Sequence, residues 1–232
     1  MAERFAGFPR EGIEFFRQLA ANNNRDWFLA HKDVYQRTCR APMEALVAEL
    51  EPRFGKAKIS RINRDVRFSR DRAPYKTYIA AGVGGSYIAL SADGLYVGAG
   101  LYRPDPGRLR QFRAAIDDGT TGRRLQAIVG SLRRNGYEVA SHETLSSAPR
   151  GYALDHARIE LLQMKDIVAG RLFAPAAWLS TARARERIER VMTDTGALVT
   201  WLQQHVTGGR REARSEKGGL KARRRARVEK SR

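Results

Sequence analysis

The stretch SYIALSADGLYVGAGLY, residues 86–102, predicts two β-strands joined by a tight turn. Apolar residues alternate with serine, tyrosine and small residues on both sides of Asp93-Gly94, and this dipeptide is a strong signal for a two-residue hairpin turn. If these two residues form the turn, Tyr87 lies opposite Gly100. One face of the hairpin then belongs to the core, and the other is a shallow floor of glycine and alanine between tyrosines.

Helical patterns lie on both sides of these strands. Apolar residues recur at spacings of three and four in several segments, and Asn24 and Asp105 are placed as N-caps for two of them. The segments are residues 9–19, 24–35, 42–50, 105–116, 125–132, 155–167 and 178–202. Helices, then strands, then helices again predict a single α+β domain over residues 1–206, with a largely antiparallel sheet packed with helices.

The composition is that of a chain that can bury a sizeable core, since 42% of its 232 residues are apolar. The longest apolar stretch, residues 79–90, contains three glycines and is much shorter than the roughly 20 residues of a membrane-spanning helix. The N-terminus lacks an apolar export segment, and Cys39 is the only cysteine, which excludes an internal disulfide. These features predict a cytoplasmic protein with no membrane partner, in which Cys39 is an unreactive helical residue.

Positive charge is concentrated at the C-terminus. The formal net charge is +18, and residues 207–232 hold eleven Lys or Arg residues against three Glu, with almost no apolar residues. We expect this basic tail to be disordered. It is either a solubilising extension or an arm that binds RNA, DNA or another anionic surface without sequence preference.

A second basic cluster lies where the central strands are expected to begin, in the segment RDVRFSRDRAPYKTY that starts at Arg64. Strand alternation places Arg64 on the apolar face, where a guanidinium needs a partner. That partner is either an acid such as Asp65 or Asp71, or the anion of a ligand. On the opposite face, Arg61, Asp65 and Arg67 belong to one row in which successive side chains are about 7 Å apart, and Asp65 lies between the two arginines. A carboxylate in this position should stay ionised, which favours a clamp over a proton-transfer base.

The turn that follows contains Asp71, Pro74, Tyr75 and Lys76. Asp71 can accept hydrogen bonds from backbone N–H groups of the turn, whose geometry Pro74 presets. Tyr75 and Lys76 would point to opposite faces of a regular strand. Both can therefore serve one site only if the backbone is irregular there.

Other kinds of site find little support in the sequence. His31, His142, His156 and His205 show no metal-ligand spacing, so no metal site is expected. The sequence lacks a G-x-S-x-G nucleophile motif, and its glycine pairs do not lie in a strand-to-helix turn, so no nucleotide cofactor is expected. The three tryptophans fall on apolar helical faces and are expected in the core.

Three segments, NNNRDWF (residues 22–28), RINRDVRFSRDRAPYKT (61–77) and APRGY (148–152), resemble the family known as domain of unknown function 2461. The resemblance extends over roughly residues 5–205 and leaves out the tail. Where the family usually has Asp-Lys before the proline, this chain has Asp71-Arg72, which keeps the charge. The resemblance implies a family-wide role for several residues but no activity. These residues are Asn23, Arg25, Trp27, Arg61, Arg64, Asp65, Arg67, Asp71, Tyr75 and Lys76.

The leading hypothesis is recognition of an anionic ligand, either phosphate-bearing or nucleic acid, by an arginine-rich cleft near the tyrosine–glycine floor. The candidate ligand-binding residues are Asn23, Arg25, Arg61, Arg64, Asp65, Arg67, Asp71, Tyr75 and Lys76. One alternative is an enzyme that acts on a phosphorylated or carboxylated small molecule, in which Asp65 or Asp71 orients a water or hydroxyl. The other is an ion-paired scaffold without a ligand.

Overall fold

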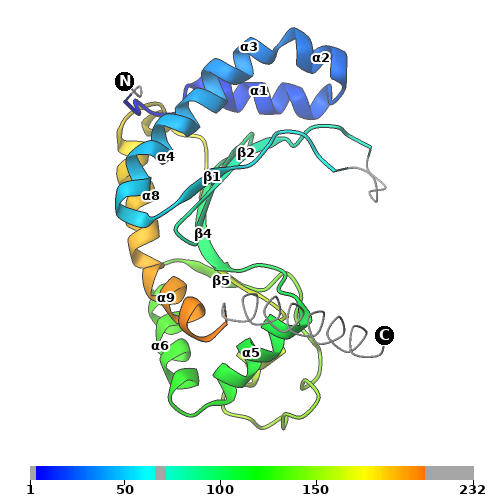
Figure 1. Cartoon of the computed structure of the whole chain (residues 1–232), viewed down its shortest axis with the longest axis vertical. Coiled ribbons are helices and arrows are strands. Elements are labelled where there is room, and N and C mark those ends of the chain that lie inside the picture. Colours follow the sequence, from blue (N-terminus) through cyan, green and yellow to red (C-terminus); the bar gives the residue numbers. More distant parts are fainter. Residues whose placement is uncertain (1–3, 66–71, 207–232) are drawn as a thin grey trace, which may run out of the picture. The chain divides into compact units, whose positions relative to one another are not determined.

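The computed structural model of the chain describes residues 4–65 and 72–206, which form helices and a six-stranded sheet (Figure 1). This confirms the predicted α+β class. The chain falls into two compact units, each assembled from three separate stretches. Unit 1 comprises Met1–Ala99, Gly136–Glu138 and Ala169–Gly196, and unit 2 comprises Gly100–Asn135, Val139–Val168 and Ala197–Arg232. The basic tail, residues 207–232, lies outside the described residues, and the domain boundary at residue 206 stays a prediction.

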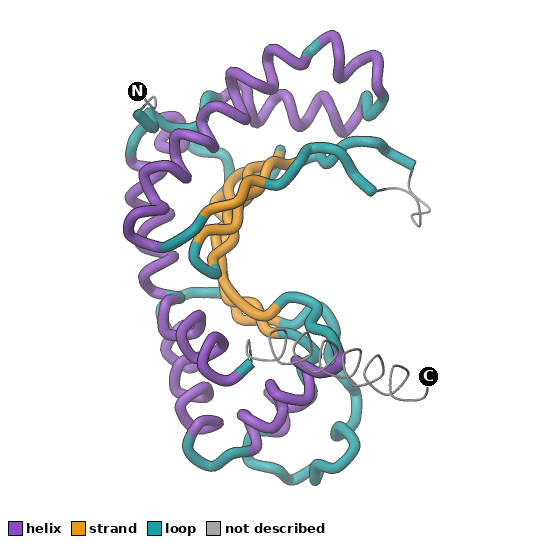
Figure 2. The backbone as a smooth tube through the Cα atoms, in the orientation of Figure 1, coloured by secondary structure: helices purple, strands orange, loops and turns teal. Residues whose placement is uncertain are grey.

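The strands are hydrogen-bonded in the order β1-β2-β3-β4-β6-β5. Figure 2 shows the strands in orange and the helices in purple. Their bounds are Ala57–Ile59 (β1), Tyr78–Val83 (β2), Ser86–Ser91 (β3), Gly94–Leu101 (β4), Glu138–Ala140 (β5) and Ile167–Phe173 (β6). Neighbours from β1 to β4 pair antiparallel, as predicted. Ile79, Ile88 and Val97, one from each of β2, β3 and β4, are fully buried and belong to the core.

The hairpin of β3 and β4 forms with a register different from the predicted one. Tyr87 lies opposite Gly98 rather than opposite Gly100. Because side chains alternate with a period of two along a strand, this shift of two positions leaves every side chain on its predicted face. The predicted register was therefore wrong, whereas the division into an apolar face and a tyrosine–glycine face was correct.

Gly94 accounts for the difference in register. Ser91 pairs with Gly94, so Ala92-Asp93 forms the turn and Gly94 already belongs to β4. Gly94 has φ +115°, and a Cβ atom at this position would lie 2.1 Å from the carbonyl oxygen of Phe173. The glycine is thus required by the close approach of another main chain, which a dipeptide motif does not reveal.

The helices of unit 1 precede β1 and follow β6. Their bounds are Arg10–Ala21 (α1), Arg25–Ala30 (α2), Lys32–Tyr35 (α3), Gln36–Arg40 (the π-helical turn η1), Ala41–Phe54 (α4), Ala177–Ser180 (the 3-10 turn η2) and Arg183–Asp194 (α8). Asn24 caps α2 as predicted, since its side chain accepts a hydrogen bond from the N–H of Trp27 at 2.9 Å. Phe15, Phe28 and Tyr35 form an aromatic cluster that packs α1 against α2 and α3.

Unit 2 has its own core. Its helices are Pro106–Asp117 (α5), Thr121–Arg134 (α6), Ile159–Gln163 (α7) and most of Gly196–His205 (α9). Asp105 caps α5 as predicted, with its carboxylate accepting hydrogen bonds from two backbone N–H groups of the first turn. Trp201 is fully buried, and its indole N–H donates to the carbonyl oxygen of Thr121 at 3.0 Å. Its ring packs edge-on against Phe112, with the ring centroids 6.1 Å apart.

The helix predicted over residues 155–167 forms only over Ile159–Gln163 (α7), so its first four and its last four residues are not helical. The helix α7 ends at Gln163, and Ile167 instead begins β6, whose sequence is IVAGRLF. A short apolar run of this kind fits a buried strand as well as a helical face, and periodicity alone does not separate the two.

The long helix predicted over residues 178–202 is interrupted twice. Residues 177–180 form the 3-10 turn η2, and α8 begins only at Arg183. The second interruption is at Thr195, whose buried hydroxyl donates to the carbonyl oxygen of Val191 at 2.8 Å, and a new helix, α9, begins at Gly196. None of the helices in the described part of the chain has the length and apolar content needed to cross a membrane.

Candidate functional site

The two arms of the basic segment form a short antiparallel ladder in unit 1. The backbone N–H of Arg64 donates to the carbonyl oxygen of Pro74 at 2.8 Å, and the N–H of Lys76 donates to the carbonyl oxygen of Ile62 at 2.8 Å. Residues 66–71, which join the arms, lie outside the described residues. The ladder places Arg64 and Lys76 on adjacent segments. A binding site that uses both side chains needs them to lie on neighbouring segments in this way.

Asn23 holds this ladder from the loop between α1 and α2. Its amide donates to the carbonyl oxygen of Tyr75 at 2.9 Å, and its side-chain oxygen accepts from the N–H of Tyr75 at 3.0 Å. Tyr75 also forms an isolated β-bridge with Asn63, and its buried ring stacks on Phe28 with centroids 4.0 Å apart. Asn23 and Tyr75 therefore position the backbone of the site.

A cavity of about 620 Å³ lies beside the ladder. Its lining combines charged, aromatic and small residues. They are Ala20, Asn23, Arg64, Asp65, Ala73, Tyr75, Lys76, Thr77 and Tyr78. Five of the candidate residues named from the sequence are thus brought together, namely Asn23, Arg64, Asp65, Tyr75 and Lys76.

Lys76 is the most perturbed cation of this cavity. Its pKa is lowered first by burial, which disfavours a charged ammonium, and further by the positive charge of Arg61. Its Nζ lies 5.9 Å from the centre of the Tyr78 ring, in reach of a weak cation–π contact. Arg61 itself is exposed and does not line the cavity, yet its charge acts on Lys76.

Tyr75 and Lys76 line the same cavity although they are adjacent in sequence. In a regular strand their side chains would point to opposite faces. The backbone at these two residues is irregular. Tyr75 forms an isolated bridge, and regular strand structure begins at Tyr78 with β2. An irregular approach to β2 therefore lets consecutive side chains serve one site.

The remaining candidate residues are not brought into the cavity. Arg25 is exposed at the first position of α2 and is absent from the lining. Arg67 and Asp71 lie outside the described residues, so their role stays a prediction. Asp65 is exposed, and it lines the cavity as the only carboxylate among the described lining residues.

Cys39 is unreactive, as its predicted helical setting suggested. It is fully buried in η1, and burial raises the pKa of its thiol to about 12, although a hydrogen bond with Thr38 opposes the shift. A thiol that stays protonated near neutral pH is a poor nucleophile.

The prediction of three core tryptophans is correct only for Trp201. Trp27 and Trp178 are half-buried at the surface of unit 1. Trp27 stacks on His31 with centroids 4.1 Å apart, and the guanidinium of Arg187 lies 4.4 Å from the centre of the Trp178 ring. An apolar helical stripe does not distinguish a buried tryptophan from one at the edge of the core.

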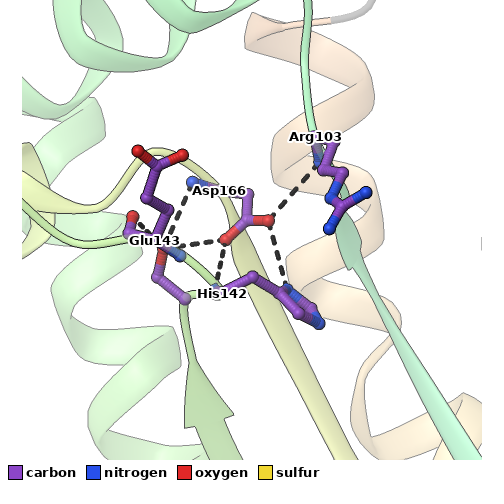
Figure 3. Close-up of polar contacts among 5 residues, drawn as sticks. Arg103, His142, Glu143 and Asp166 are labelled. Atoms are coloured by element: carbon purple, nitrogen blue, oxygen red, sulfur yellow. Dashed lines mark hydrogen bonds and ion pairs between the residues drawn. The ribbon is translucent and has the colours of Figure 1, made fainter. Parts of the chain in front are cut away.

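The sequence did not single out two histidine–aspartate pairs in unit 2. His142 lies 3.2 Å from Asp166, and His156 lies 3.2 Å from Asp117 (Figure 3 shows the first pair). The partners are far apart along the chain, so no local motif could have revealed them. Among residues 4–65 and 72–206, no group of three or more His, Cys, Asp or Glu side chains is arranged to hold a metal ion.

Comparison with known proteins identifies a family but no individual relative. No curated protein and no solved structure matches the chain significantly. One family model does match, over residues 11–201, which include the ladder, the cavity and all three segments NNNRDWF, RINRDVRFSRDRAPYKT and APRGY. The chain therefore belongs to the family described as "Conserved hypothetical protein (DUF2461)", as those segments predicted.

Proposed function

We propose that this chain binds a phosphate-bearing small molecule in the cavity lined by Arg64, Asp65 and Lys76. The observation that carries the proposal is that two cations, Arg64 and Lys76, line one cavity. The lowered pKa of Lys76 agrees with it, because burial and the nearby charge of Arg61 both disfavour its ammonium form. A phosphate bound by Arg64 and Lys76 in the cavity would offset the burial of the ammonium and its repulsion by Arg61, because phosphate oxygens accept charge-assisted hydrogen bonds from guanidinium and ammonium groups.

The size and stiffness of the cavity support a small ligand. A volume of about 620 Å³ falls within the range of pockets that enclose small molecules. The two hydrogen bonds between Asn23 and Tyr75 and the stacking of Tyr75 on Phe28 hold the backbone of the ladder before a ligand arrives. Such preorganisation reduces the entropy lost on binding.

Replacing Lys76 by methionine tests this proposal. Isothermal titration calorimetry with inorganic pyrophosphate should show binding to the full chain, weakened about tenfold in Lys76→Met because a charge-assisted hydrogen bond is lost. The matched control is Lys58→Met, since Lys58 is an exposed lysine on β1 of the same unit and does not line the cavity. This control should bind pyrophosphate as the wild type does.

Two results would contradict a small-molecule site at Lys76. One is equal weakening by Lys76→Met and Lys58→Met, which would indicate non-specific screening of the surface charge. The other is strong binding of a twelve-residue oligothymidylate at a fixed salt concentration with no binding of pyrophosphate. That outcome would indicate that the cavity binds nucleic acid and not a small molecule.

An enzyme is the second candidate, because Asp65 lines the same cavity as the two cations. A carboxylate beside cations can orient a water toward a phosphoryl group while the cations stabilise the developing negative charge. The same titrations separate the two functions. Release of orthophosphate from pyrophosphate would favour an enzyme, and recovery of intact pyrophosphate favours a binding protein.

A separate prediction concerns the basic tail, residues 207–232. Deleting residues 207–232 removes a net charge of +8, the excess of eleven Lys or Arg residues over three Glu residues. We expect the deletion to leave the melting temperature unchanged and to weaken non-specific binding of oligonucleotides. The plot of log K against log salt concentration should become shallower, since each phosphate contact contributes about 0.9 to the slope for duplex DNA. An unchanged slope would leave only the solubilising role.

A further inference from the structure

A buried carboxylate organises a polar cluster in unit 2, whereas the residues of the anion-binding cavity belong to unit 1. Asp166 is 2% exposed, and both of its oxygens accept hydrogen bonds (Figure 3). Oδ1 accepts from the hydroxyl of Ser141 at 2.7 Å and from the N–H of His142 at 2.8 Å. Oδ2 lies 3.2 Å from Nδ1 of His142 and accepts a longer bond, 3.5 Å, from the N–H of Arg103.

These hydrogen bonds keep Asp166 ionised. Burial by itself raises the pKa of a carboxyl group, but the donors from Ser141, His142 and Arg103 outweigh it and leave the pKa of Asp166 below its ordinary value. The single hydroxyl hydrogen of Ser141 has two acceptors at 2.7 Å, Asp166 and the carbonyl oxygen of Glu143. The charged carboxylate is the stronger acceptor of the two.

An ionised Asp166 fixes the orientation of the His142 ring. A carboxylate only accepts hydrogen bonds, so Nδ1 of His142 carries the proton between them. The imidazole is 51% exposed, and within the described part of the chain its Nε2 makes no hydrogen bond. A neutral His142 therefore presents the lone pair of Nε2 to solvent.

The surroundings of His142 could hold a substrate. The exposed ring of Tyr102 meets the imidazole edge-on with centroids 4.8 Å apart, and the guanidinium of Arg103 lies 5.3 Å from the centre of the Tyr102 ring. Arg103 is the one non-glycine residue in the described ranges with a positive φ, +41°. Strained backbone of this kind persists where the surrounding structure enforces it, often at functional sites. Glu143 and Lys165, the other charged groups of the cluster, pair with each other.

His156 provides an internal contrast in the same unit. It also pairs with an aspartate, but its Nδ1 accepts the N–H of Arg158 at 3.0 Å, so its proton lies on Nε2, 3.2 Å from Asp117. Both ring nitrogens of His156 are therefore occupied within the protein. Of these two pairs, only the Asp166–His142 pair leaves a basic nitrogen for a substrate.

We propose that Asp166 and His142 form a proton-transfer dyad that hydrolyses an ester carrying an anionic group, with Arg103 binding that group. His142 is the catalytic residue, and Asp166 is a positioning residue that orients the imidazole and stabilises its protonated form. The reaction needs only acid–base chemistry and a water molecule. This site is independent of the function proposed for unit 1.

The proposed step conserves protons and electron pairs. An O–H bond of water breaks, its proton passes to Nε2 of His142, and the water oxygen forms a bond to the carbonyl carbon of the ester. As the bond from that carbon to the alcohol oxygen breaks, the imidazolium returns the proton to the alcohol. A carboxylic acid and an alcohol leave, and the ionised Asp166 with neutral His142 is restored.

A first experiment needs no variant. A long-range ¹H–¹⁵N NMR spectrum of the full chain is recorded at a pH at which the histidines are neutral. It reports, for each histidine, which ring nitrogen carries the proton. We expect the proton on Nδ1 for His142 and on Nε2 for His156. A proton on Nε2 of His142 would overturn the proposal, because Nδ1 could then not donate to Asp166.

A second experiment measures hydrolysis of the mono-4-nitrophenyl ester of succinic acid by release of 4-nitrophenolate. We expect the rate supported by the full chain to fall about a hundredfold in His142→Gln, and to remain unchanged in His156→Gln. Arg103→Gln should raise KM for this anionic ester by a larger factor than it raises KM for neutral 4-nitrophenyl acetate. Hydrolysis no faster in the wild type than in His142→Gln overturns the proposal.

Discussion

Gly100→Ala is expected to lower the free energy of unfolding by roughly 3 kcal/mol, because the site has no room for one methyl group. A Cβ atom at this position would lie 2.1 Å from the carbonyl oxygen of Ile167 and 2.7 Å from Cα of Val168. Both atoms belong to the main chain of β6, so no change of rotamer relieves the overlap. The neighbouring strand has to move instead, and its hydrogen bonds are strained. Urea denaturation followed by circular dichroism measures the loss.

Gly196→Ala is the matched control for this substitution. Gly196 is the first residue of α9, and a Cβ atom there would meet no atom within 4 Å. Alanine is favoured over glycine in a helix, so the control should be neutral or slightly more stable. Equal stability of Gly100→Ala and Gly196→Ala would show that β4 and β6 are not packed as closely as described.

Asp166→Asn is expected to cost about 3 kcal/mol near neutral pH, because an amide cannot replace a carboxylate that only accepts hydrogen bonds. Oδ1 of Asp166 faces the N–H of His142, and Oδ2 faces the N–H of Arg103. Whichever way the asparagine amide is turned, its NH₂ group points at a backbone donor. That donor then loses its acceptor beside a buried side chain, and the loss should be visible in urea denaturation.

The cost of Asp166→Asn should depend on pH. The pKa of Asp166 is lower in the folded protein than its ordinary value, so the unfolded chain binds the proton more readily. The stabilisation by the carboxylate is therefore complete above the unfolded pKa, about 3.9, and is lost as the pH falls through the folded pKa. The difference in stability between wild type and Asp166→Asn should shrink over this acidic range. Asp93→Asn, at an exposed turn, should show little cost at any pH. A pH-independent cost for Asp166→Asn would mean that its carboxylate is not ionised in the fold.

The sequence determined those features that depend on residues a few positions apart. Alternation in residues 86–102 predicted β3 and β4, and Asn24 and Asp105 were recognised as N-caps from the side-chain oxygens that they offer to the next turn. The RINRDVRFSRDRAPYKT segment contains Arg64 and Lys76, which line the cavity of unit 1, while their role in binding stays a prediction. In each case the structural feature depends on contacts within one element or between neighbouring segments. The local order of residues is therefore enough to predict it.

Only the tertiary structure decided the features that depend on distant partners. The register of the hairpin is set where Gly94 approaches Phe173, and the reciprocal bonds between Asn23 and Tyr75 join a helical loop to an irregular strand. Asp166 is likewise buried beside His142, immediately before β6, at a position that the sequence predicted to be helical. Hydrogen bonds and van der Waals exclusion act over a few ångströms in space, and separation along the chain does not predict that distance. The fold had to bring these groups together before their chemistry could be recognised.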